Sequence, residues 1–160
     1  QFLATLDDGR VAIAALAVGC LQACLDMSLA YAGDRQTFGA PIGRKQGLAF
    51  QIADLEVMLH ASRLLTYRAA AMKDSQRDGG GASVAQFKQA AAVAKLYATE
   101  AAVTGTRIAT QVFGGYGFME EYPVARFYRD PKVLEIGEGT SDIQKMIIGR
   151  RLLEDYKLKG

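Results

Sequence analysis

One short segment of the sequence, EIGEGTSDIQ at residues 135–144, places a carboxylate where it could take part in catalysis. Glu138 lies between Gly137 and Gly139, and the two residues that follow, Thr140 and Ser141, are types that often begin helices. Glycines leave little bulk beside the side chain. Glu138 is therefore either a catalytic base or an acid stabilised by about 0.3–1 kcal/mol at a helix N-terminus.

Two further loops have the composition of ligand-binding segments. The segment DRQTFGAPIG, residues 34–43, carries an arginine and a threonine beside two glycines, and QVFGGYGF, residues 111–118, combines three glycines with aromatic residues. Glycines allow a ligand to approach the backbone closely, and helix N-termini favour anions. These loops suit a phosphate-bearing ligand, although glycine loops also serve simply to turn the chain.

The composition argues against several classes of partner. The net charge is +2, from 19 basic and 17 acidic residues, and no basic run is present, so we expect no nucleic-acid partner. No charge-free stretch of about 18 apolar residues occurs, so we expect no membrane span. The use of cysteine indicates a reducing compartment, which predicts a cytoplasmic protein, or one of the mitochondrial matrix in a eukaryote.

Cys20, Cys24 and His60 are the residues that a metal or redox site would need. The two cysteines lie four residues apart in a helical segment, and we expect them to pack as small apolar side chains on one buried face. Two thiols and a single histidine do not make a tetrahedral zinc site, so no metal site is expected. His60, in mid-helix, is expected to be packed or exposed rather than catalytic.

Helices must position these loops, because apolar residues recur at spacings of three and four along most of the chain. The sequence predicts helices over residues 8–32, from 44 into the seventies, over 83–113, briefly after Pro123, and over 141–156. The core stripe expected on the first of them consists of Ile13, Leu16, Cys20, Cys24 and Met27.

Two pairs of residues have the spacing of capping boxes, Ser83 with Gln86 and Ser141 with Gln144. No segment of alternating apolar and polar residues is long enough to predict a strand. The predicted fold is therefore all-α, an up-down four-helix bundle with three long helices and a shorter fourth.

Five motifs, taken in order, resemble the C-terminal helical domain of the FAD-dependent acyl-CoA dehydrogenase family, and the likeness runs from about Leu6 to about Arg151. The motifs are DDGR, DRQTFGAPIGRKQ, QVFGGYGF, YRDPKV and GEGTSDIQ. The resemblance implies a four-helix bundle that completes a subunit with an upstream helical domain and a middle β domain. We therefore expect residues 1–160 to be a single domain and a fragment of a longer enzyme, since the chain does not begin with methionine.

The resemblance also implies a reaction, the α,β-dehydrogenation of an acyl-CoA substrate to a 2-enoyl-CoA. Glu138 matches the base that removes the α proton, while hydride passes to FAD and an electron-transferring flavoprotein accepts the electrons. A minority of the family carries its base just before the arginine of the first motif, where this chain has Gly9. Asp7 and Arg10 match positions on the substrate side.

A second set of positions matches family contacts to FAD. Arg35 and Thr37 match residues that hold the pyrophosphate, commonly that of the neighbouring subunit, and Gln46 matches a contact to the adenine half. The other matching positions are Phe38, Gln111, Gly114, Gly115, Gly139, Thr140 and Asp142. Two residues depart from the family pattern. Asp142 replaces the more usual glutamate or glutamine, and Gly137 replaces a frequent tyrosine, which makes the pocket roomier there.

Cofactor contacts from two subunits imply a homo-oligomer, either a dimer or a dimer of dimers. Because the upstream domains are not in this chain, we expect the isolated domain to fold as a helical oligomer, to hold FAD weakly and to be inactive. Two alternatives stay open, an acyl-CoA oxidase-like flavoenzyme and a non-catalytic helical oligomerisation module. The retained Glu138-Gly139-Thr140 sequence argues against the related monooxygenases and nitroalkane oxidases.

Overall fold

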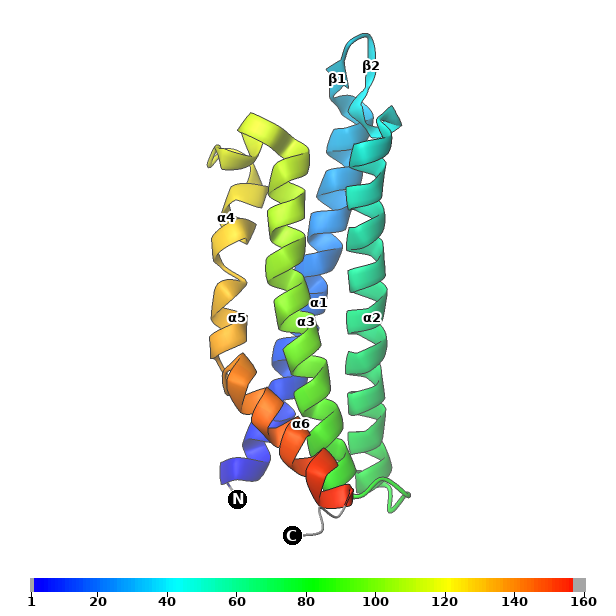
Figure 1. Cartoon of the computed structure of the whole chain (residues 1–160), viewed down its shortest axis with the longest axis vertical. Helices are drawn as coiled ribbons and strands as arrows, with labels where there is room; N and C mark the ends of the chain where they lie inside the picture. The colour runs from blue at the N-terminus through cyan, green and yellow to red at the C-terminus, as the bar shows by residue number, and fades with distance from the viewer. Residues whose placement is uncertain (1, 157–160) are drawn as a thin grey trace.

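The structure, a computed structural model, describes residues 2–156, so Gln1 and residues 157–160 of the expected domain lie outside the described part. The long helices are α1 (Phe2–Asp34), α2 (Gln46–Arg77) and α3 (Val84–Phe113), and a shorter α6 (Ser141–Asp155) follows near the C-terminus. These four helices run alternately up and down, with α6 crossing the lower part of α3 at an angle (Figure 1). The predicted all-α, up-down four-helix bundle is confirmed.

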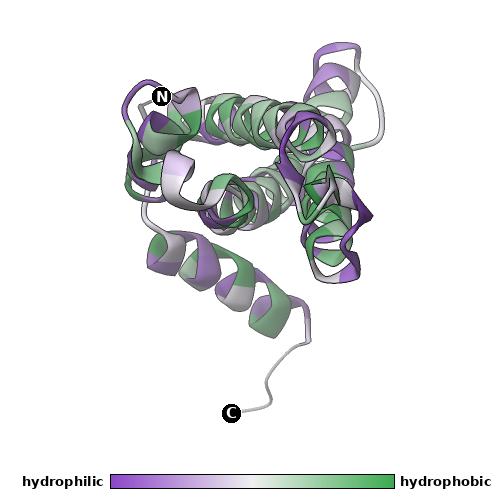
Figure 2. Ribbon diagram, turned by 90° about the horizontal axis from the view of Figure 1, so that it is seen from above, coloured by the Kyte–Doolittle hydropathy of each residue, from purple (hydrophilic) through white to green (hydrophobic). Residues whose placement is uncertain are grey.

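The remaining elements are short and join the long helices. They are β1 (Gln36–Thr37), β2 (Ala40–Pro41), η1 (Ile42–Arg44), η2 (Gly114–Phe118), α4 (Pro123–Arg129) and α5 (Lys132–Ile136). The two strands form a two-stranded antiparallel hairpin within the loop that the sequence predicted as irregular. From above, α1, α2 and α3 form one group, and α6 lies across its side (Figure 2).

The core lies where α3 packs between α1 and α2. The residues of α3 that face it are mostly alanines, and because small side chains allow helix axes to come close, the three long helices pack tightly. The buried core residues are Ala14, Ala17, Leu21, Leu25, Leu55, Leu59, Ala69, Ala90, Ala94, Ala98, Ala101 and Ala102. The predicted stripe on the first helix was wrong at Leu16, whose residue is 60% exposed. Apolar residues occur all round α1, so periodicity alone does not identify its buried side.

Gly105 is a point of very close helix packing. A Cβ atom built at Gly105 would lie 2.5 Å from Leu21 Cδ2 and 3.2 Å from Leu55 Cδ2. We expect Gly105→Ala to lower the free energy of unfolding by about 1–3 kcal/mol through overpacking, despite the better helix propensity of alanine. Urea denaturation measures the effect. Gly149→Ala in α6, where a Cβ would meet nothing within 4 Å, is the matched control and should not destabilise.

The helix ends agree with the sequence in part. Ser83 caps α3 through a complete capping box with Gln86, as predicted. The second predicted box was wrong, because Thr140 caps α6 by accepting a hydrogen bond from the Ile143 amide, and Gln144 turns its side chain elsewhere. The first helix begins at Phe2 rather than near Asp8, since no glycine or proline precedes that position to stop it. The short α5 was not predicted.

Cys20 and Cys24 are buried free thiols that pack with Phe113 and Val124, as predicted for small apolar side chains. Their mutual hydrogen bond lowers the pKa of Cys20 and raises that of Cys24. His60 is exposed and pairs with Glu56 one turn away. Among residues 2–156, no group of three or more histidine, cysteine or acidic residues is arranged to hold a metal ion.

Within the described residues, α1 is the one helix that is long enough and apolar enough to span a membrane. Its mean hydropathy is 1.8. Core helices of bundles pass the same test. The side of α1 that carries Ala14, Ala17 and Leu21 is buried in the core formed with α2 and α3. Packing within the bundle therefore accounts for only part of the hydropathy of α1, because 39% of its apolar window is buried.

Candidate active site

Glu138 lies in the short turn between α5 and α6, and its backbone has an unusual conformation. Its φ angle is 54°, in the left-handed region that glycine tolerates and that other residues rarely adopt. Such a conformation costs about 1–3 kcal/mol and persists where the surroundings impose it. Gly139, with φ 92°, continues the turn. Neighbouring groups must therefore hold the backbone of Glu138 in this conformation.

Two buried side chains hold this turn through its backbone carbonyl oxygens. The Lys95 ammonium donates hydrogen bonds to the carbonyls of Glu135, at 2.9 Å, and of Gly139, at 2.8 Å. The Gln144 amide donates to the carbonyls of Glu138, at 3.2 Å, and Gly139, at 2.9 Å. Lys95 comes from α3 and Gln144 from α6, so the turn is fixed from two helices.

The beginning of α1 forms the third side of the site. The Arg10 guanidinium donates to the Glu138 carbonyl at 3.4 Å and is also paired with the buried Asp7 carboxylate one turn earlier. Between them, Gly9 leaves space for the Glu138 side chain, because a Cβ atom there would lie 2.6 Å from Glu138 Oε2. Asp7 lies inside the helix, so it does not cap it.

Burial is the main electrostatic influence on Lys95. It lowers the pKa of the ammonium below its usual value, and the Glu135 carboxylate acts in the opposite direction. The structure thus places a half-buried carboxylate, a buried guanidinium and a buried ammonium at one site. Such an arrangement is suited to proton transfer by a positioned base.

Comparison with known proteins places this chain in a family. The model of the family "Acyl-CoA dehydrogenase, C-terminal domain" matches residues 1–153. The chain belongs to the acyl-CoA dehydrogenase family. The match covers nearly the whole chain and confirms the resemblance seen in the sequence.

The relatives that this acyl-CoA dehydrogenase domain resembles are much longer than it is. A probable acyl-CoA dehydrogenase of Bacillus subtilis is 48% identical over 96% of the chain and 38% of its own length. The mitochondrial short-chain specific acyl-CoA dehydrogenase of Bos taurus is 44% identical over 96% and 35%, respectively. The solved butyryl-CoA dehydrogenase of Megasphaera elsdenii superimposes with a TM-score of 0.86 at 40% identity, over 94% of this chain and 37% of that one. The chain therefore spans less than two-fifths of each.

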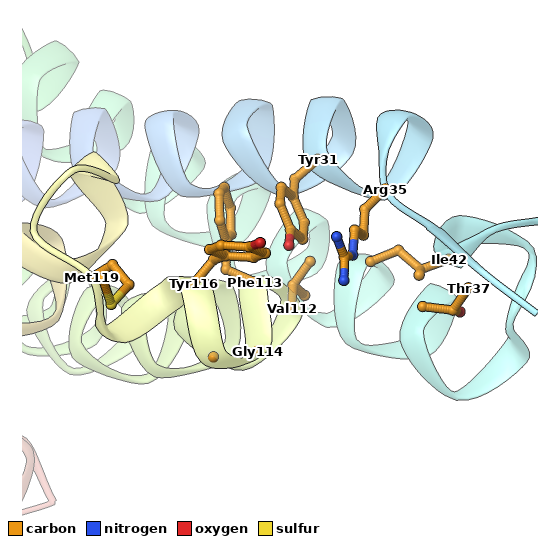
Figure 3. A pocket seen from close by; sticks show the side chains of 10 residues that line it. Tyr31, Arg35, Thr37, Ile42, Val112, Phe113, Gly114, Tyr116 and Met119 are labelled. Atoms are coloured by element: carbon orange, nitrogen blue, oxygen red, sulfur yellow. The ribbon is translucent and has the colours of Figure 1, made fainter.

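The acyl-CoA dehydrogenase domain has a second candidate site at the other end of the bundle, near the hairpin. A cavity of about 490 Å³ lies between the end of α1, the hairpin and the end of α3. Tyr31 stacks on Phe113 with ring centroids 4.1 Å apart, and the Arg35 guanidinium lies 5.4 Å from the centre of the Tyr116 ring. Figure 3 shows these aromatic rings side by side, with Arg35 beside them. Burial raises the pKa of Tyr31.

The sequence-predicted residues therefore fall into two groups. Asp7, Arg10 and Glu138 come together directly, and Gly139, Thr140 and Asp142 follow Glu138 into α6. Arg35, Thr37, Gly114 and Gly115 line the cavity at the other end. Phe38 is 98% exposed at the hairpin tip, and Gln46 and Gln111 are exposed near that end. Figure 1 shows the hairpin and the α5–α6 junction well apart, so one chain does not bring the two groups together.

Sequence reasoning missed Lys95 and Tyr31, whereas Phe113 and Tyr116 of the cavity belong to the predicted QVFGGYGF segment. The available signal for Lys95 was its setting, since it is a lone charged residue among the alanines that form the buried face of α3. Gln144 was noticed, but as a helix cap. Its side chain instead holds the turn that carries Glu138.

Proposed function

We propose that this chain is the C-terminal domain of a longer flavoenzyme that α,β-dehydrogenates acyl-CoA thioesters, with Glu138 as the base. The observation that carries the proposal is the mounting of Glu138, whose left-handed backbone is held from three helices while its carboxylate lies against Gly9. A surface acid at a helix start needs no such support. Membership of the acyl-CoA dehydrogenase family supports the reaction class.

In this reaction the Glu138 carboxylate takes the proton from the carbon α to the thioester. The electrons of that C–H bond form the Cα–Cβ double bond as a hydride leaves the β carbon. When bound, FAD supplies the acceptor for this hydride. Arg10 and Asp7 keep the adjoining wall of the site fixed, because their buried pair ties the first turns of α1 to the Glu138 carbonyl.

The cavity near the hairpin has residues that suit the diphosphate of FAD. Arg35 is exposed, and a guanidinium binds phosphate oxygens with two parallel hydrogen bonds. Gly114 and Gly115 have open space where a Cβ atom would be, so a ligand can reach their backbone. Because this cavity lies well away from Glu138, we propose that it holds the FAD of a neighbouring subunit, with Thr37, Phe38, Gln46 and Gln111 as further contacts.

Removing the Arg35 guanidinium should weaken FAD binding. We expect Arg35→Ala to raise the dissociation constant of FAD about 10- to 100-fold, in line with the loss of a charge-assisted bidentate contact. Arg35→Lys should fall between wild type and alanine, since it keeps the charge without the planar fork. Flavin released on ultrafiltration of the full-length protein measures the effect. Arg77→Ala, at the opposite end of α2, should bind FAD as wild type does.

Exposed apolar side chains support the proposal that other domains and subunits cover this bundle. Phe50, Val57 and Leu64 recur at intervals of seven along α2, and each is at least 60% exposed. A row of exposed apolar side chains along one helix suits an interface with another domain or subunit. We propose a homo-oligomer, a dimer or a dimer of dimers, with an electron-transferring flavoprotein as electron acceptor. The bacterial and mitochondrial relatives are compatible with the cytoplasm or the mitochondrial matrix.

The isolated chain should therefore be a poor flavoprotein. We expect it to fold as a helical oligomer, to retain little FAD through purification and to oxidise no acyl-CoA. The flavin-to-protein absorbance ratio and an activity assay measure this directly. A stoichiometric amount of flavin on the purified chain would contradict the expectation.

The proposed function is tested with the full-length protein under anaerobic conditions. A panel of short, branched and aromatic acyl-CoA esters is added while the flavin absorbance is followed, because Gly137 leaves the acyl specificity open. Its backbone would accept a side chain, with the nearest atom 3.5 Å from a Cβ. Bleaching by one ester supports the dehydrogenase and identifies its substrate class. A flavin that stays oxidised with the whole panel contradicts it, and peroxide formed in air identifies the oxidase alternative.

A further inference from the structure

Lys95 is a fully buried charged residue on the alanine-rich face of α3. Its relative exposure is 0%, and its neighbours on the buried face of α3 include Ala91, Ala94 and Ala98, which are equally buried. Lysine is almost never fully buried unless its charge is compensated, since removing an ammonium from water is costly. The complete burial of Lys95 therefore needs an explanation.

The partners of Lys95 are backbone carbonyl oxygens. Its ammonium hydrogen bonds to the carbonyls of Glu135 and Gly139, which bracket the three residues that include Glu138. Within the described residues, the Lys95 ammonium forms no ion pair with a carboxylate. One ammonium thus ties together the two ends of the turn that carries the base.

Stability alone does not account for a lysine at this position. A buried charge is often replaced by an apolar side chain of similar volume with no loss of stability, or with a gain. The alanines around Lys95 would accept such a side chain. What an apolar residue cannot do is donate hydrogen bonds to two carbonyls of a turn whose central residue has a strained backbone.

We propose that Lys95 is a positioning residue for the base, whose ammonium closes the 135–139 turn so that Glu138 keeps its left-handed backbone and its carboxylate stays against Gly9. This inference rests on the proposed function for its catalytic consequence, but the closure of the turn does not depend on it. Gln144 assists from α6 by binding the Glu138 and Gly139 carbonyls. Lys95 acts through Glu138 and not on the substrate.

Closure of the turn is tested by amide hydrogen exchange in the full-length holoenzyme. In Lys95→Met, we expect the peptide covering residues 135–144 to exchange at least about tenfold faster, because local opening becomes easier. The matched control is Thr106→Val, a substitution of another fully buried polar residue on α3 whose hydroxyl bonds within its own helix. It should leave that peptide unchanged. Unchanged exchange in Lys95→Met would overturn the proposal.

The positioning role is tested by a double-mutant cycle on the rate of flavin reduction. Lys95→Met should lower that rate about 100-fold, the size expected from a misplaced catalytic group, while the dissociation constant of a non-reducing acyl-CoA analogue stays the same. In the Glu138→Gln background, the same substitution should change the residual rate less than about twofold, because the two residues act as one unit. An equal loss in both backgrounds would show that Lys95 acts independently of Glu138 and would overturn the proposal.

A second variant covers the case in which Lys95→Met does not fold. Lys95→Gln retains one amide donor but is too short to bridge both carbonyls, so faster exchange and a slower rate are again expected. Wild-type behaviour of both measures in Lys95→Gln would overturn the proposal. If the turn loosens while Glu138→Gln leaves flavin reduction intact, the closure by Lys95 stands and the proposed function fails.

Discussion

Replacing Glu138 with glutamine in the full-length holoenzyme should slow flavin reduction by an acyl-CoA substrate about 10²- to 10⁴-fold, the range that a general base contributes. Glutamine has nearly the same size and shape but cannot accept the α proton. The turn itself should survive, because Lys95, Gln144 and Arg10 bind backbone carbonyls that the substitution leaves in place. Stopped-flow absorbance under anaerobic conditions measures the rate.

The controls for Glu138→Gln separate catalysis from structure. Flavin content, melting temperature and the affinity for a non-reducing acyl-CoA analogue should all remain at wild-type values. Glu138→Asp keeps the carboxylate but withdraws it by one methylene, so its rate should lie between those of wild type and glutamine. A glutamine variant that reduces its flavin as fast as wild type would leave the non-catalytic oligomerisation module as the better reading of this chain.

The helices of the bundle were predictable because local signals and core packing agree there. The Ser83–Gln86 box and the glycines after Arg77 mark helix ends without reference to the rest of the fold. The buried side of α1 was less predictable, since Leu16 and Leu21 are equally apolar and only packing against α3 decides between them. Periodicity does not resolve a helix that is apolar on every side.

The site was predictable as a set of residue types, but its geometry was not. The glycines around Glu138 indicated a special turn, and the structure gives the reason in the left-handed φ of Glu138 itself. The donors that hold this turn are far away in sequence, with Lys95 40 and 44 positions from the carbonyls it binds. Sequence spacing contains no signal for such contacts, because they arise only when α3 packs against the α5–α6 turn.

Gly9 should be important for the reaction because it leaves space for the Glu138 carboxylate, although glycine has no functional group. A Cβ atom at Gly9 would lie 2.6 Å from Glu138 Oε2 and 2.7 Å from Cδ, closer than packed atoms allow. The atom that must move is the free end of a flexible side chain, so the shift is easy for the fold. It displaces the carboxylate that the proposed mechanism needs in place. We therefore expect Gly9→Ala to reduce the rate of flavin reduction about 100-fold.

Gly9→Ala should lose activity without losing stability. Within a helix, alanine is favoured over glycine by about 0.5–1 kcal/mol, so the variant should unfold at the same or a slightly higher urea concentration. Gly19→Ala is the matched control, because it makes the same change on the same helix where a Cβ would meet nothing within 4 Å. It should gain similar stability and keep wild-type activity.

This pairing of variants separates displacement of the base from general damage to the helix. If Gly9→Ala and Gly19→Ala are both fully active, the Glu138 carboxylate does not need its place against α1, and the geometry of the site has been misread. If both lose activity, the helix backbone and not the Glu138 contact is responsible. Loss in Gly9→Ala alone, with its stability intact, is the result that ties catalysis to the space that one missing side chain leaves beside the base.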